Sequence, residues 1–133
     1  MTMQTVYYQR FKTPRFACAA HVHTLGAPHS DTASFLHTYV GSVTEGAAIH
    51  LTIGIDEQQM VQHACFKAYG CPAVIASGDY ICEWMQGKSI AELMTINAAQ
   101  LSADLQLVPA KFHAAVMAVQ ALQQLADQLA EPH

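Results

Sequence analysis

The stretch Phe66-Lys67-Ala68-Tyr69-Gly70-Cys71-Pro72-Ala73-Val74-Ile75-Ala76-Ser77 carries the clearest local signal in the chain. We expect a strand to end in its first half and a helix to begin in its second. Gly70 permits a backbone corner that a side chain would obstruct, and the fixed φ of Pro72 suits the first helical position. Cys71 is therefore expected at or beside the N-cap, where the positive helix end favours a thiolate. Such a thiolate could bind metal or act as a nucleophile, whereas a cysteine that merely fills the turn would be inert.

Apolar patterns before this corner predict a small antiparallel sheet. Residues 47–56 alternate between apolar and more polar side chains, which is typical of a strand with one buried face. The polar run 56–59 predicts a turn, and 61–69 follows as the second arm of a hairpin. A weaker pattern at 35–42 predicts another strand. We therefore expect an α+β fold in which a sheet of about three strands packs against helices.

Helical signals dominate the second half of the chain. Apolar residues at helical spacing predict a helix over 72–86 that stops at Gly87. Ser89-Ile90-Ala91-Glu92 has the pattern of a capping box, and Asn97 to Gln100 repeats it. Pro109 precedes a long predicted helix from Ala110 to about Leu129. Its predicted inner stripe consists of Phe112, Ala115, Val116, Val119, Leu122, Ala126 and Leu129. We expect this helix and the one over 72–86 to cover one face of the sheet.

Length and composition narrow the class of protein. The chain has 133 residues, which fits a single domain over 1–133, and we expect 1–34 to be a loosely ordered N-terminal segment that begins with a short helix. The formal net charge is −4, with only six Lys and Arg, which argues against a nucleic-acid partner. We find neither a signal-peptide pattern nor an apolar run of roughly 20 residues, so we expect a cytoplasmic protein with no membrane contact.

Cysteine and histidine usage bears on metal binding. In a cytoplasmic protein the four cysteines are expected to be reduced, and no CxxC pair indicates a zinc ribbon. We expect Cys65 and Cys82 to pack in the core, while the pattern assigns no role to Cys18. The eight histidines include His21, His23 and His29 in a predicted loop, where solvation is a more common fate than metal binding.

Several segments match the motifs of a known family. They are Val40-Gly41-Ser42, Ile49 to Asp56, Ala64 to Cys71 followed by Ala76-Ser77, Glu83-Trp84-Met85-Gln86-Gly87-Lys88-Ser89, Leu107 to His113, and Tyr8 to Arg15 near the start. Taken together, these segments resemble the IscU/NifU-type iron–sulfur cluster assembly scaffolds. The resemblance runs over most of the chain and implies the SufE/NifU-like scaffold fold.

The resemblance also implies a site, and the chain departs from it. The family holds [2Fe–2S] clusters with three cysteines, an aspartate and a histidine. Cys71 and His113 occupy two of these positions with the family residue. Glu45 and Ala114 stand where the other two cysteines are expected, and Ala47 stands in the aspartate position.

This altered ligand set suits a single ion better than a cluster. Iron–sulfur clusters are usually held by four thiolates, whereas zinc and ferrous iron accept mixed sulfur, nitrogen and oxygen ligands. We therefore expect an iron or zinc ion at Cys71, His113 and Glu45, and no stable [2Fe–2S] cluster. The alternative is a retained fold with an inactive site.

Three functions follow from these observations. The first is a divergent scaffold-like protein of iron–sulfur cluster assembly. The second is an interaction module that contacts a cysteine desulfurase or an Hsp70-type chaperone without holding a cluster; Val108 replaces the first proline of the family's chaperone-recognition segment. The third is an enzyme with Cys71 as nucleophile and His113 as base. It ranks last because no oxyanion loop or orienting third group is evident, so we expect a scaffold or accessory protein rather than an enzyme.

Overall fold

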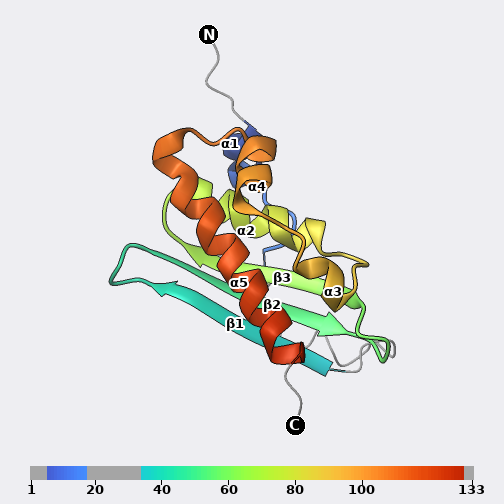
Figure 1. Cartoon of the computed structure of the whole chain (residues 1–133). Helices are drawn as coiled ribbons and strands as arrows, with labels where there is room; N and C mark the ends of the chain where they lie inside the picture. Colours follow the sequence, from blue (N-terminus) through green and yellow to red (C-terminus); the bar gives the residue numbers. More distant parts are fainter. Residues whose placement is uncertain (1–5, 18–33, 131–133) are drawn as a thin grey trace.

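The computed structural model describes residues 6–17 and 34–130, which form an antiparallel sheet packed against helices (Figure 1). The sheet contains β1 (Ser34–Ser42), β2 (Ala47–Ile55) and β3 (Val61–Tyr69) in the order β1-β2-β3. Both strand pairs are antiparallel. The predicted α+β class and the predicted strands are therefore confirmed.

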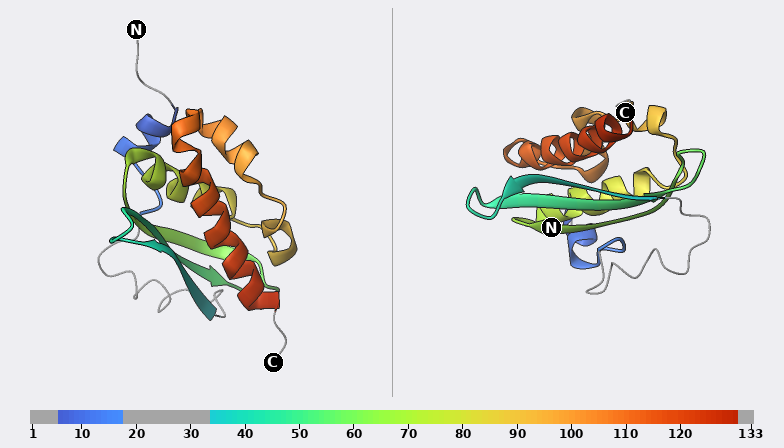
Figure 2. Two further views of the ribbon diagram at one scale, coloured as in Figure 1. Left: turned by 60° about the vertical axis from the view of Figure 1, so that its left-hand side comes forward. Right: turned by 90° about the horizontal axis from the view of Figure 1, so that it is seen from below.

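Six helical segments accompany the sheet. They are α1 (Val6–Lys12), α2 (Pro72–Trp84), α3 (Ile90–Leu93), α4 (Ala98–Leu105), the 3₁₀ helix η2 (Pro109–Lys111) and α5 (Phe112–Ala130), all within the part of the chain that the structure describes. Seen edge-on in Figure 2, α5 runs along one face of the sheet. Both α2 and α5 contact the sheet, as expected, and they also contact each other.

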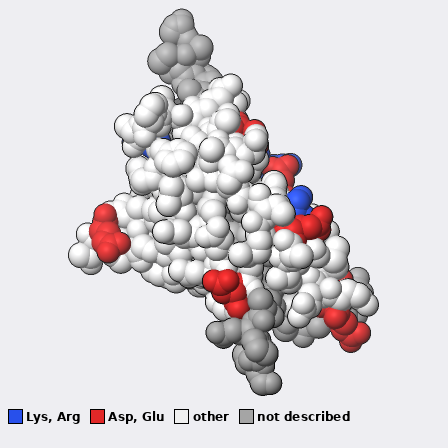
Figure 3. Space-filling model, viewed as in Figure 1, with Lys and Arg blue, Asp and Glu red and all other residues white. Residues whose placement is uncertain are grey.

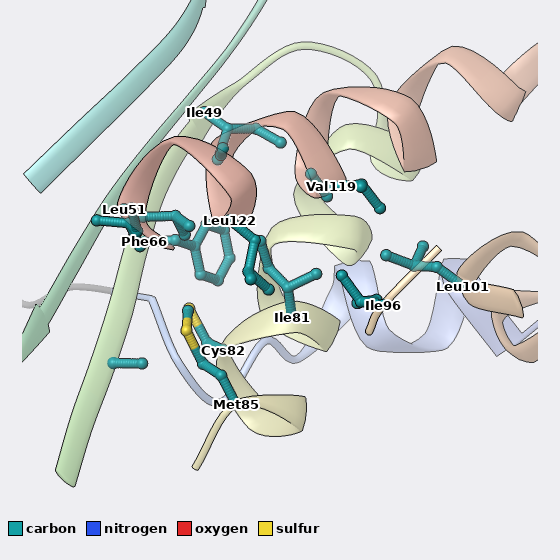
Figure 4. Packing of buried hydrophobic residues seen from close by; sticks show 14 of the residues in the cluster. Ile49, Leu51, Phe66, Ile81, Cys82, Met85, Ile96, Leu101, Val119 and Leu122 are labelled. Atoms are coloured by element: carbon teal, nitrogen blue, oxygen red, sulfur yellow. The ribbon is translucent and has the colours of Figure 1, made fainter. Parts of the chain in front are cut away.

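The core lies between the sheet and these two helices (Figure 4). Ile49 and Leu51 of β2 are fully buried, because every second residue of the strand faces the helices. Gly78 of α2 lies directly over the ring of Phe66, and a Cβ built there would come within 2.8 Å of a ring carbon. The glycine that interrupts the apolar face of α2 thus lets the helix approach the sheet closely.

Helix boundaries follow the predicted capping signals with two exceptions. One is α2, which ends at Trp84 with Met85 as its C-cap, before the predicted stop at Gly87. Ser89 and Glu92 form a reciprocal capping box, and Asn97 caps α4 through the N–H of Gln100. The predicted long helix, however, begins as the short helix η2, and Phe112 is 39% exposed rather than part of the inner stripe. The change from 3₁₀ to α geometry rotates this first turn away from the register of the buried stripe.

The N-terminal segment is anchored by a buried carboxylate. Asp79 of α2 is only 1% exposed and accepts hydrogen bonds from Arg10 Nη1 at 2.6 Å and from the backbone N–H groups of Arg15 and Phe16 at 2.8 and 2.7 Å. Glu83, one turn later, pairs with both arginines. Residues 6–17 are therefore fixed to α2, in contrast to the expected loose segment over 1–34, whereas 18–33 lie outside the described residues.

The cysteines differ partly from expectation. Cys82 is a buried free thiol, as predicted, and burial raises the pKa of this thiol, with a smaller contribution from nearby Asp79. Cys65 is disulfide-bonded, so the prediction that all four cysteines are reduced is wrong. Disulfide formation depends on the approach of residues distant in sequence, which composition does not reveal. Cys18 lies outside the described residues.

Candidate functional site

Cys71 lies at the corner between β3 and α2, as its local sequence predicts. It is the N-cap of α2 with extended backbone angles (φ −74°, ψ 168°), and Pro72 begins the helix. Its thiol is free, half-buried, and makes no capping hydrogen bond. Gly70 turns the chain with φ +139°, a backbone conformation that residues other than glycine rarely adopt. The free thiol is therefore presented at the mouth of a helix.

The turn between β1 and β2 packs beside this corner. A Cβ on Gly70 would lie 3.3 Å from the Ala47 Cβ and from the Gly46 carbonyl oxygen, so the two loops approach closely. Within the turn, the N–H of Glu45 donates to both the carbonyl and the hydroxyl oxygen of Ser42, each at 3.1 Å. These bonds fix the backbone of Glu45 and leave its carboxylate exposed.

His113 reaches the same region from α5. It is the second residue of that helix and is exposed. His113 and Glu45 line one pocket of about 290 Å³, whose other lining residues are Val40, Gly41, Ala47, Met117 and Gln120. Gly41 is required here, because a Cβ at that position would come within 2.2 Å of the Ala47 carbonyl oxygen. The pocket therefore brings together two of the three predicted ligands.

The third predicted ligand does not line this pocket. Cys71 is absent from its walls. Among the residues that the structure describes, no group of three or more His, Cys, Asp and Glu side chains is placed to hold a metal ion. Glu45, Cys71 and His113 thus lie on neighbouring segments without forming a ready ligand cage. Of the three replaced positions, Glu45 and Ala47 line the pocket, whereas Ala114 is completely buried in the core.

An apolar rim flanks the site, which we define as Val43, Tyr69, Val108 and Phe112. Each of these side chains is exposed and lies within two residues of Glu45 or Cys71, or on the segment leading to His113. Sequence reasoning missed this rim, because the outward direction of residues at strand ends and in turns is not set by a repeating pattern. The face seen in Figure 3 is mostly uncharged, with carboxylates scattered near its margins.

Comparison with known proteins identifies the family. The profile of the NifU-like N-terminal domain matches residues 6–131. The chain belongs to this family. Among curated members of the wider group, the chain is 39% identical over 83 residues to the iron–sulfur cluster assembly scaffold protein IscU of Buchnera aphidicola subsp. Schizaphis graminum, and 34% identical over 83 residues to IscU of Escherichia coli K12. Each match covers 62% of this chain and 65% of the relative.

Solved structures support the NifU-like fold. A crystal structure titled as a putative iron–sulfur cluster assembly scaffold protein for the SUF system, from Fervidobacterium islandicum AW-1, aligns with a TM-score of 0.64 at 14% identity. The alignment covers 91% of this chain and 93% of the other. The relatives are named as scaffold proteins rather than enzymes. In addition, none of the described helices is both long and apolar enough to cross a membrane.

Proposed function

We propose that this NifU-like domain is a divergent scaffold-like protein of iron–sulfur cluster assembly that binds a single iron or zinc ion. The observation that carries the proposal is the pocket shared by Glu45 and His113, next to the corner that presents the free thiol of Cys71. Family membership supplies the functional context. By the same reasoning we propose a cytoplasmic protein with a cysteine desulfurase and an Hsp70-type chaperone as partners.

The donor set supports one ion rather than a cluster. A thiolate, an imidazole and a carboxylate are all zinc ligands, and three of them leave a fourth tetrahedral position open. Ferrous iron also accepts such ligands. A [2Fe–2S] cluster usually takes four thiolates, and the positions corresponding to the other two family cysteines hold Glu45 and Ala114. Binding requires the Cys71 corner and the turn at Glu45 to close on the ion, because the thiol does not line the pocket.

The apolar rim favours a second candidate function. Four exposed apolar side chains lie near the candidate site, and contact with a protein partner would remove them from water. An interaction module would keep this surface and bind desulfurase or chaperone without carrying metal. Its segment before His113 has Val108 in place of the family's first proline, and Val108 is exposed at the start of η2.

Metal analysis of the untagged, full-length chain tests the proposal. We expect Co²⁺, used as a zinc substitute, to give a thiolate-to-metal absorption band that Cys71→Ser abolishes. His113→Gln and Glu45→Gln should each weaken binding, since each removes one ligand. Cys82→Ala is the matched control, because Cys82 is a buried thiol remote from solvent; it should leave the band unchanged.

Two results would overturn the single-ion proposal. One is a Co²⁺ or Fe²⁺ titration with no Cys71-dependent signal in a folded protein, which together with retained desulfurase binding would favour the interaction module. The other is a wild-type protein that forms a stable [2Fe–2S] spectrum after anaerobic incubation with iron and sulfide, since the ligand count argues against that product.

A further inference from the structure

A pair of histidines lies on the sheet face turned away from α5. Ile49 and Leu51 face the core, so His50 between them faces the opposite side. Thr38 of β1 hydrogen-bonds Gln124 of α5 at 2.6 Å, which places the preceding residue, His37, on that opposite side as well. In the register, His37 is opposite Thr52 and Tyr39 is opposite His50. His37 and His50 are therefore diagonal neighbours on adjacent strands.

The two rings are close, and one of them is held in place. Their centroids are 5.6 Å apart with an angle of 36° between the ring planes. His37 Nδ1 lies 3.2 Å from the hydroxyl oxygen of Thr52, which is itself buried, and among the described residues no hydrogen bond occupies His37 Nε2. Among the described residues, no hydrogen bond occupies a ring nitrogen of His50. The pair thus presents nitrogen donors that none of the described residues uses.

We propose that His37 and His50 form a two-histidine site for a divalent transition-metal ion such as Zn²⁺, separate from the pocket at Glu45 and His113. Zinc–nitrogen bonds of about 2.0–2.1 Å place the centroids of two imidazoles on one ion roughly 5–6 Å apart. The observed spacing falls in this range. Thr52 serves as the outer partner that orients a metal-binding histidine.

The residues around His37 and His50 determine which ions the pair can bind. No third His, Cys, Asp or Glu joins the pair in the described part of the chain. The described residues therefore supply two ligands and leave the remaining coordination positions to water or to an added ligand. Lys67 is opposite His50 in the register, but it is exposed and its long side chain can hold the ammonium away from the ion. Soft ions that prefer thiolate ligands are not favoured by two imidazoles, whereas borderline ions such as Zn²⁺ bind imidazole well.

A zinc titration followed by NMR of the histidine imidazoles tests the site in the full-length chain, because it reports each histidine separately. We expect the His37 and His50 signals to shift together and to saturate at the same zinc concentration. His50→Gln should abolish the response of His37, and Thr52→Val should weaken it by releasing the His37 ring. His113→Gln is the control and should leave both responses unchanged.

The proposal fails if His37 responds to zinc equally well in the His50→Gln protein, which would show independent imidazoles. It also fails if neither signal shifts at zinc concentrations that saturate a free imidazole. Thermal unfolding gives a second readout. Zinc should raise the Tm through preferential binding to the folded state, and the increase should be smaller in both His37→Gln and His50→Gln than in the wild-type protein.

Discussion

Single residues decide how closely the elements of this domain approach one another. Gly70 gives the corner before Cys71 a positive φ, and Gly78 lets α2 touch the ring of Phe66. Neither feature follows from hydrophobic periodicity, which treats a glycine on an apolar face as a neutral gap. Both are specific to positions where a Cβ would meet a neighbouring group within 3.3 Å or less.

Replacement of Gly78 by alanine tests this at the residue scale. In an exposed helix the change would stabilise the protein, by about 0.5–1 kcal/mol. Here we expect destabilisation of about 1–3 kcal/mol, because the new methyl group would overlap the Phe66 ring. Urea unfolding measures the difference. Adding Phe66→Leu to Gly78→Ala should recover part of the loss; a stabilised Gly78→Ala single variant would contradict the packing described here.

At the scale of elements, the contact between α1 and α2 depends on charge. Arg10 bonds Asp79 and Glu83 at 2.6 and 2.8 Å, and Arg15 bonds Glu83 at 2.8 Å. Hydrogen bonds from Arg10, and then from Arg15, lower the pKa of Glu83 below its ordinary value of 4.5. At acid pH the Glu83 carboxyl therefore binds fewer protons in the folded protein than in the unfolded chain.

The direction of the Glu83 pKa shift determines how stability depends on pH. The contribution of Glu83 to stability is complete above about pH 4.5, the unfolded value, and is lost as the pH falls through the lower, folded value. We expect Glu83→Gln to reduce the free energy of unfolding at neutral pH and to differ less from wild type as the pH is lowered. Unfolding measured by urea at several pH values checks this. Glu57→Gln, in an exposed turn, should show no such convergence.

The elements also show what the sequence could and could not predict. The alternation over 47–56, the capping box at Ser89 and the Gly70-Cys71-Pro72 corner are local signals, and the structure contains the strand, the cap and the N-cap they indicate. The anchoring of Arg10 by Asp79, 69 residues away, is not local and was not predicted. The same holds for the site: sequence named Cys71, Glu45 and His113, but only the fold shows which two of them share a pocket.

At the scale of the whole molecule, substitutions of exposed apolar side chains should affect partner binding with little effect on stability. We expect Val43→Ser combined with Val108→Ser to weaken binding to the proposed partners, a cysteine desulfurase and an Hsp70-type chaperone. Because both side chains are exposed, the stability should change by no more than about 0.5 kcal/mol for each substitution. Calorimetric binding and thermal unfolding measure the two effects. Met94→Ser, an exposed apolar residue after α3, is the matched control and should leave partner binding unchanged.

The complete burial of Ala114 has a consequence for protein engineering. The resemblance to the IscU/NifU-type scaffolds implies a cysteine at this position, but here the side chain lies in the interior of the protein. A cysteine restored there would direct its sulfur into the packed interior and add volume that the surrounding residues would have to accommodate. Introducing a cysteine there would therefore disturb the packing before it supplied a usable thiolate. A redesign of this site toward a cluster would have to change the packing around residue 114 as well as the ligands.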